Sequence, residues 1–193
     1  MKIYDISQEL TGCVVFPGDR APKTELVSDM KQGALYNLTD LSLCAHNGTH
    51  IDAPFHFLQD GNTVDKIPLE KFVGPCYLVH HDGAFTAADA QKLLARQDDC
   101  KKRILIGGKA TVTADAAKVF VAHGIDLLGN ESQTVGPEDA PMEVHKILLD
   151  KDVVLLEGLR LSGIEEGEYL LCAAPINIAG SDGAPCRAIL IKL

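Results

Sequence analysis

The sequence contains no tryptophan, and aromatic residues make up only 5% of its 193 residues. The core therefore has to consist mainly of aliphatic side chains, which a hydrophobic content of 46% can supply. No apolar run approaches the roughly 20 residues that a transmembrane helix needs. These features predict one globular domain over residues 1–193 and no membrane partner.

Positive charge is also scarce. The chain has 18 lysines and arginines against 27 acidic residues, which gives a formal net charge of −9. Its only cationic run is Lys101-Lys102-Arg103. Because a polyanion would be repelled at long range, we do not expect nucleic acid as a partner.

The cysteines form no C-x-x-C pair, and the N-terminus carries no secretory signal. They are scattered at Cys13, Cys44, Cys76, Cys100, Cys172 and Cys186. We therefore expect reduced, buried thiols and a cytoplasmic protein. Its partner is expected to be a small-molecule substrate rather than a macromolecule.

The order of hydrophobic patterns predicts a mixed α/β domain. Strands are expected at Met1–Asp5, Cys76–His80, Arg103–Ile106, Val153–Glu157, Tyr169–Ala173 and Ala188–Lys192. The alternation of Leu41, Leu43 and Ala45 with polar neighbours predicts a further, half-buried strand. Helices are expected at Ala90–Gln97, Ala114–His123 and Pro141–Leu149.

Start and stop signals support these helices. Thr86 and Asp89 have the spacing of a capping box before the first helix, which is expected to turn Leu93 and Leu94 inward. Gly124 stands where the second helix needs a C-terminal cap.

Metal-ligating residue types are concentrated in one segment, His46-Asn-Gly-Thr-His50-Ile-Asp52-Ala-Pro-Phe-His56. The three histidines and the aspartate all fall at even positions, so an extended chain would direct them to one side. The odd positions hold mainly apolar or small residues that can face a core. The spacing predicts a strand that leads into a turn.

A helical alternative exists because H-x-x-x-H also places two histidines on one face of a helix, as in zinc proteases. However, Asn47, Gly48 and Pro54 are poor helix formers, and the glutamate of those proteases is missing. The extended conformation is therefore favoured.

Neutral imidazoles and a carboxylate are suitable ligands for zinc or manganese. Such an ion lowers the pKa of a bound water from about 15.7 to roughly 7 and polarises a carbonyl group. An additional histidine can then carry a proton to the leaving group. A single histidine in this segment would be explained well enough by a solvated strand or by a hydrogen bond in the core. Four ligand-type residues, all at even positions, are better explained by a metal site.

Two further residues are weaker candidates. His145 is a single histidine on a predicted helix, and such residues usually lie at the surface. Glu157 ends an apolar strand, where a buried carboxylate would need a partner.

The segment from His46 to His56 resembles the H-x-G-T-H-x-D-A-P-x-H signature of the cyclase family, which includes bacterial kynurenine formamidase. The similarity extends over nearly the whole chain. It includes Phe16-Pro-Gly-Asp19, the 12-residue spacing from His145 to Glu157, Ala174–Asn177 and Asp182–Arg187.

The resemblance implies roles for the ligand-type residues. His56 would be the catalytic proton donor and acceptor. Asp52 would bridge two ions in the two-metal members, whereas other members use one ion. The implied ligands are His46, His50 and Asp52 for the first ion, and Asp52, His145 and Glu157 for the second.

The resemblance further implies a compact, swivelling β/β/α domain. It also implies a homodimer or higher homo-oligomer, with residues of the neighbouring subunit near the pocket. Phe16 stands where kynurenine formamidases usually have tryptophan, so the substrate would meet a smaller stacking surface without an indole donor. Ile125–Gln133 retains little of the family's I-D-T-x-S-x-D segment, which leaves the substrate open.

Together these features predict a metal-dependent amidohydrolase. It would cleave a carbon–nitrogen bond of a small amide, aryl formamide or cyclic amide through a metal-bound hydroxide. A lactonase or esterase with the same site is an alternative. A metal-binding or small-molecule-binding protein without catalysis is another, and His56, a base beyond the minimal ligand set, argues against it.

Overall fold

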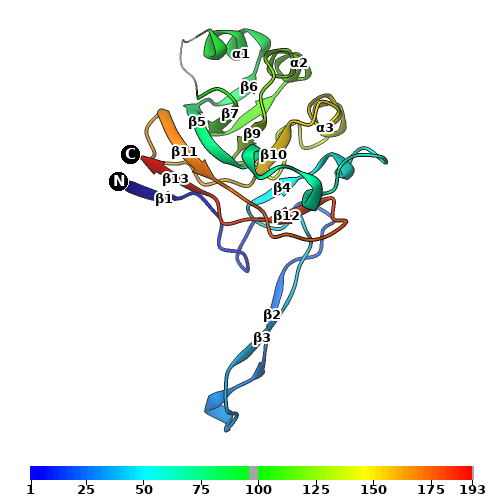
Figure 1. The fold of residues 1–193 in the computed structure, drawn as a ribbon, viewed down its shortest axis with the longest axis vertical. Coiled ribbons are helices and arrows are strands. Elements are labelled where there is room, and N and C mark those ends of the chain that lie inside the picture. Colours follow the sequence, from blue (N-terminus) through cyan, green and yellow to red (C-terminus); the bar gives the residue numbers. More distant parts are fainter. Residues whose placement is uncertain (96–99, 193) are drawn as a thin grey trace.

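The computed structural model describes residues 1–95 and 100–192. Its main feature is a nine-stranded mixed sheet with the order β1-β13-β11-β5-β7-β9-β10-β4-β12. These strands are β1 (Lys2–Asp5), β13 (Ile189–Lys192), β11 (Gly167–Cys172), β5 (Val73–His80), β7 (Arg103–Gly107), β9 (Leu127–Asn130), β10 (Val154–Glu157), β4 (His50–Asp52) and β12 (Gly183–Pro185). The predicted mixed α/β class is confirmed, and Figure 1 shows the curl of the sheet.

The centre of the sheet is parallel and its two sides are antiparallel. Strands β5, β7, β9 and β10 run parallel to one another. All residues of β7 and β10 are buried, as expected for strands covered on both faces. In β7, Ile104 and Ile106 belong to one hydrophobic cluster and Leu105 to another, because successive side chains point to opposite faces.

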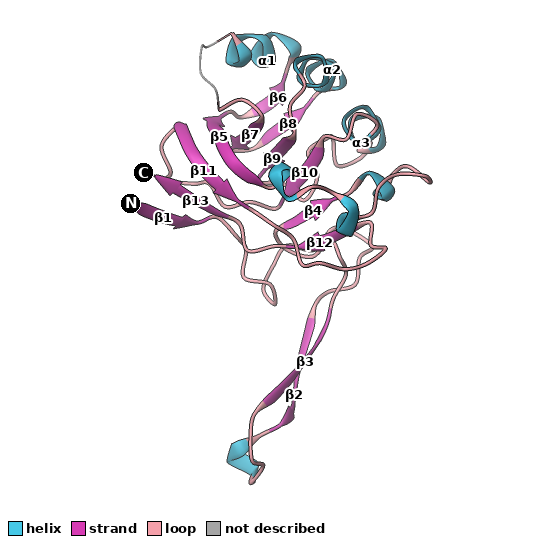
Figure 2. Ribbon diagram, viewed as in Figure 1, coloured by secondary structure: helices cyan, strands magenta, loops and turns pink. Residues whose placement is uncertain are grey.

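The helices α1 (Ala87–Leu94), α2 (Ala114–His123) and α3 (Met142–Leu149) lie together on one face of this sheet (Figure 2). The predicted capping box is present, since Thr86 and Asp89 bond each other's backbone N–H groups. Helix α1 therefore begins directly after Thr86, earlier than predicted.

The inward face predicted for α1 is confirmed in part. Leu93 is buried but Leu94 is only half-buried, and the predicted helix end at Gln97 lies outside the described residues. Gly124 caps α2 with a φ of 76°.

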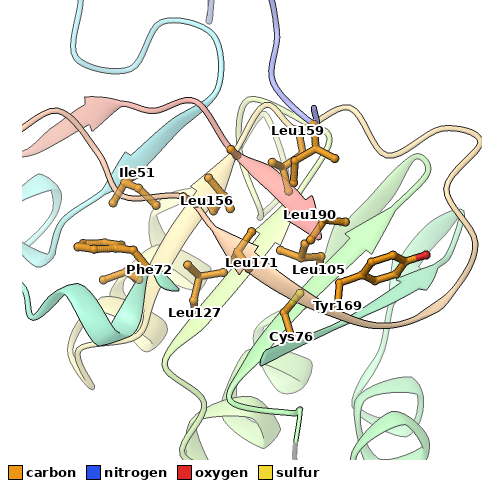
Figure 3. Close-up of a cluster of buried hydrophobic side chains, with 14 of the residues drawn as sticks. Ile51, Phe72, Cys76, Leu105, Leu127, Leu156, Leu159, Tyr169, Leu171 and Leu190 are labelled. Atoms are coloured by element: carbon orange, nitrogen blue, oxygen red, sulfur yellow. The ribbon is translucent and has the colours of Figure 1, made fainter. Parts of the chain in front are cut away.

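The opposite face of the sheet carries the second hydrophobic cluster, which Figure 3 shows in close-up. It brings together residues far apart in sequence, among them Ile51, Phe72, Leu156 and Leu190. Ile51 is fully buried here, so the middle residue of β4 anchors that strand in the core. Its neighbours His50 and Asp52 consequently point to the other side of the strand.

Outside the main sheet, β6 (Gly83–Phe85) pairs with β8 (Ala110–Val112), and β2 (Lys23–Ser28) pairs with β3 (Leu38–Ser42). The β2–β3 hairpin, which we call the arm, projects away from the body of the molecule (Figure 1). The prediction of a half-buried strand through Leu41, Leu43 and Ala45 is wrong. Strand β3 ends at Ser42 and is exposed throughout, because it pairs only with β2.

Other expectations are met in part. The described cysteines form no disulfide bond, but only Cys76 is buried and the others are half-buried. Helix α3 begins at Met142, after Pro141. None of the helices in the described residues has the length and apolar character needed to cross a bilayer.

Candidate metal centre and active site

Strand β4 lies between β10 and β12, and both neighbours pair with it in antiparallel register. His50 stands opposite Glu157 of β10, and Asp52 stands opposite Gly183 of β12. His50, Asp52 and Glu157 are each at most 2% exposed. The sheet therefore holds a histidine and two carboxylates together in the interior.

The predicted strand that leads into a turn is present as β4 and the short helix after it, but it does not extend back to His46. His46 lies in a turn before the strand, and Gly48 has a φ of 67°, which interrupts extended structure. His56 lies in a short 3-10 helix, Pro54–His56. The three imidazoles still converge on Asp52. Its carboxylate oxygens lie 2.8 Å from His46 Nδ1, 3.4 Å from His50 Nε2 and 4.0 Å from His56 Nε2.

Helix α3 contributes a fourth imidazole. His145 is 2% exposed, so the expectation that a lone helix histidine lies at the surface does not hold. Its Nε2 lies 3.2 Å from Glu157 Oε1 and 3.5 Å from Asp52 Oδ2. Glu157 has the partner that its burial requires, and its Oε1 also accepts a hydrogen bond from Val135 N–H at 2.8 Å.

Backbone carbonyls determine which ring nitrogen of two histidines faces the carboxylates. His50 Nδ1 lies 3.0 Å from Gly48 O, and His145 Nδ1 lies 2.8 Å from Pro141 O. A carbonyl oxygen can only accept, so both Nδ1 atoms carry the hydrogen. If an ion replaced the second proton, each ring would be neutral and its Nε2 lone pair would point toward the ion, which is the arrangement that orients histidines as metal ligands.

The buried carboxylates require positive charge nearby. Burial lowers the pKa of each histidine, but hydrogen bonds to carboxylates outweigh it, and the pKa rises to about 11 in His46, about 9 in His50 and about 10 in His145. Burial raises the pKa of Asp52, but hydrogen bonds from His145, His46 and His50 hold it well below its usual range. Either protons on the imidazoles or a divalent cation can balance these carboxylates, so the residues present fit a metal ion.

The donor atoms form two sets that share Asp52. In the described residues, ligand atoms of His46, Asp52 and His56 all lie within 4.8 Å of one another, and so do those of His50, Asp52 and Glu157. This grouping places His50 with Glu157 rather than with His46. A common carboxylate between two sets is the geometry of a bridging ligand.

A cavity of about 260 Å³ opens onto these residues. Its wall includes Phe16 and Phe57, so a ring-bearing ligand would meet aromatic faces there. Thr134 also lines it and is 3% exposed, and its Oγ1 has no hydrogen-bond partner among the described residues. The ligand-type residues predicted from sequence all lie around this cavity, namely His46, His50, Asp52, His56, His145 and Glu157.

A larger hollow of about 730 Å³ lies at the carboxyl ends of β5, β7 and β9. Three of its ligand-type side chains are engaged by the backbone. His80 Nε2 lies 2.7 Å from Ile164 O, Asp82 accepts from Lys109 N–H and Glu131 accepts from Gly108 N–H. Both candidate metal-ligand groups of the described residues lie at the smaller cavity, which is therefore the candidate active site.

One residue of the site was missed in the sequence. Asp182, just before β12, places Oδ2 at 2.9 Å from His46 Nε2 and at 3.1 Å from His56 Nδ1. These hydrogen bonds hold the pKa of its carboxyl below the usual range. Asp182 belongs to the C-terminal segment that resembles the family, and that similarity was the only signal available.

Comparison with known proteins gives a family model, described as Putative cyclase, that matches residues 4–137. A curated relative, the kynurenine formamidase of Erythrobacter litoralis (strain HTCC2594), is 32% identical over 204 aligned residues. The alignment covers 100% of this chain and 94% of that protein.

Solved structures agree with this comparison. A protein described as a potential metal-dependent hydrolase with cyclase activity has a TM-score of 0.84 and 29% identity, covering 98% of this chain and 96% of its own. Isatin hydrolase A from Labrenzia aggregata, bound to benzyl benzoate, has a TM-score of 0.83 at 21% identity, covering 100% and 94%. At that identity the likeness concerns the fold.

Proposed function

Because the chain belongs to the cyclase family, we propose that its cavity hydrolyses a carbon–nitrogen bond of a small amide, aryl formamide or cyclic amide with the help of a divalent metal ion. The chain is a metal-dependent hydrolase of the arylformamidase-like type, in agreement with its 32% identical formamidase relative. The amide substrate follows the activity named for that relative.

The convergence of four imidazoles on two buried carboxylates is the observation that carries this proposal. Asp52 and Glu157 are 1% and 2% exposed, and each lies within 4.0 Å of more than one imidazole nitrogen. A purely structural role does not require such a concentration of charge beside an open cavity. A protein evolved only to fold would be served better by apolar residues here.

A bound divalent ion supplies an acidified water as nucleophile and a Lewis acid for the substrate carbonyl. The family's ligand assignment remains our proposal for this chain, with His46, His50 and Asp52 at one ion and Asp52, His145 and Glu157 at another. His56 is 28% exposed in its side chain, more than the other imidazoles, and faces the cavity. It is therefore placed to donate a proton to the departing nitrogen.

We further propose zinc or manganese as the ion, at one or two per subunit. Imidazole and carboxylate donors suit both metals. The two donor sets that share Asp52 support two ions. Phe16, in the cavity wall, is proposed to bind the substrate through its ring.

The arm supports a homodimer or higher homo-oligomer, which is part of this proposal. Isolated two-stranded hairpins are marginally stable in water, and this one exposes many apolar side chains. They include Leu26, Met30, Leu35, Tyr36, Leu38 and Leu41. A second copy of the chain would cover them. The absence of disulfides among the described cysteines supports a reducing compartment such as the cytoplasm.

The test is a hydrolysis assay with a panel of aryl formamides, lactams and lactones, in the presence of Zn²⁺ or Mn²⁺. We expect turnover of the formamides and lactams and its loss after chelation. Turnover of lactones alone would replace the proposal with a lactonase. Stoichiometric metal without turnover of any substrate would leave a binding protein.

A further inference from the structure

We propose that Asp182 is the positioning residue that fixes the ring orientation and tautomer of His56. This inference rests on the proposed function, since it concerns the proton donor of the same reaction. It starts from the distance of 3.1 Å between Asp182 Oδ2 and His56 Nδ1.

An ionised carboxylate can only accept hydrogen bonds, so the hydrogen of a neutral His56 ring is held on Nδ1. The other ring nitrogen, Nε2, lies 4.0 Å from Asp52 Oδ2, which is too long for a hydrogen bond. Nε2 is therefore left to exchange a proton with the substrate. When the protonated ring acts, one proton passes from Nε2 to the departing nitrogen. The other proton stays on Nδ1, which continues to donate its hydrogen bond to Asp182.

The same carboxylate oxygen holds a second ring. Asp182 Oδ2 lies 2.9 Å from His46 Nε2, while His46 Nδ1 faces Asp52. The rings of His46 and His56 pack against each other with centroids 4.1 Å apart. One oxygen thus joins a proposed metal ligand to the proposed proton donor and sets their separation.

The fold places Asp182 here through backbone contacts. Ala53 N–H donates to Asp182 O at 2.9 Å, and Gly183 stands opposite Asp52 in the β12–β4 register. A Cβ on Gly183 would lie 2.6 Å from Ile51 O and 2.8 Å from His46 Cε1, so no larger residue fits there. The chain can approach β4 this closely only with glycine, and this approach brings the carboxylate to the rings.

The experiment compares Asp182→Ala and Asp182→Asn with a matched control, Asp65→Asn. Asp65 supports the same loop by accepting from Gly180 N–H at 3.0 Å, and no described contact joins it to a histidine of the site. For Asp182→Ala we expect kcat to fall about 10- to 100-fold with KM little changed and the metal retained. In Asp182→Asn, kcat should fall less than in Asp182→Ala, because the amide oxygen can still accept a hydrogen bond from His56 Nδ1. The control should keep kcat.

A second readout needs neither substrate nor metal. Nitrogen NMR of the neutral His56 ring should show hydrogen on Nδ1 in the wild type and a shift toward Nε2 in Asp182→Ala. An unchanged tautomer would overturn the proposal. The proposal would also be overturned if Asp182→Ala lost the metal rather than only kcat. An equal fall of kcat in Asp65→Asn would overturn it as well. Inactivity of the wild type toward every amide would instead count against the proposed function and leave the tautomer result valid.

Discussion

Glu157 stands directly opposite His50 in the antiparallel register of β10 and β4, and their side chains approach to 3.6 Å between Glu157 Oε2 and His50 Nε2. The side chain of Glu157 therefore lies on the same face of the sheet as His50, although it follows the segment from His46 to His56 by more than a hundred positions. This relationship places Glu157 among the side chains of the candidate metal site.

Replacing Glu157 by alanine should remove one donor set and leave the other. Elemental analysis of the purified variant is expected to find about half the metal of the wild type, because the ion proposed at His46, His50 and Asp52 does not use Glu157. Glu168→Ala, on the exposed side of β11, is the control and should keep all of it. Unchanged metal in Glu157→Ala would mean a single ion that does not use this carboxylate.

Asp52 and His56 should separate metal binding from turnover. Asp52→Ala is expected to lose both, since the proposed ligand assignment uses its carboxylate at both ions. His56→Ala is expected to keep the metal and lose about 100-fold or more in kcat, as is typical when a general acid is removed. Metal analysis beside steady-state kinetics distinguishes the two effects. If His56→Ala loses as much metal as Asp52→Ala, His56 is a ligand.

The arm gives a test of assembly. The wild-type protein should sediment as a dimer or larger assembly of 20.7 kDa chains, and Leu35→Asp should shift it toward the monomer. Leu35 is 93% exposed at the arm, whereas Leu69, 65% exposed, lies elsewhere and serves as the control in Leu69→Asp. A wild type that sediments as a monomer would contradict the oligomer.

Thr134 gives a prediction for stability. Its Oγ1 is buried and has no hydrogen-bond partner in residues 1–95 and 100–192. Such a group costs about 1–3 kcal/mol, so Thr134→Val should unfold at the same or a higher temperature. Thr49 is equally buried at 3%, but its Oγ1 donates to Gly158 O and accepts from Gln8 N–H. Thr49→Val should therefore lower the melting temperature. A drop in Thr134→Val of the same size would reveal a partner for that hydroxyl.

Local signals in the sequence predicted local structure well. Thr86 and Gly124 located one end each of two helices. The Thr86 side chain accepts a hydrogen bond from a free N–H group at the start of α1, and the left-handed backbone of Gly124 lets its N–H bond to carbonyls at the end of α2. The buried run ending at Glu157 was predicted as a central strand for a similar reason, since every residue in it is apolar up to the carboxylate. The identities of the ligand-type residues came from their density in one segment.

Contacts between distant parts of the chain were not predictable in this way. Alternation at Leu41 indicated a strand, but no local pattern tells whether that strand joins the main sheet or an exposed arm. The even spacing from His46 onward predicted a strand that leads into a turn, but the positive φ of Gly48 keeps His46 out of that strand. Asp182 reaches His46 across 136 positions, a distance over which spacing carries no information.

The pairing of β12 with β4 also determines when the site can form. A chain emerging from the ribosome presents His46, His50 and Asp52 long before Asp182 has been synthesised. Contacts with such large sequence separation form late, because a long loop must close before they contribute to stability. A fragment that stops short of Asp182 would contain all of His46–His56 and still lack the carboxylate that holds two of its imidazoles in place.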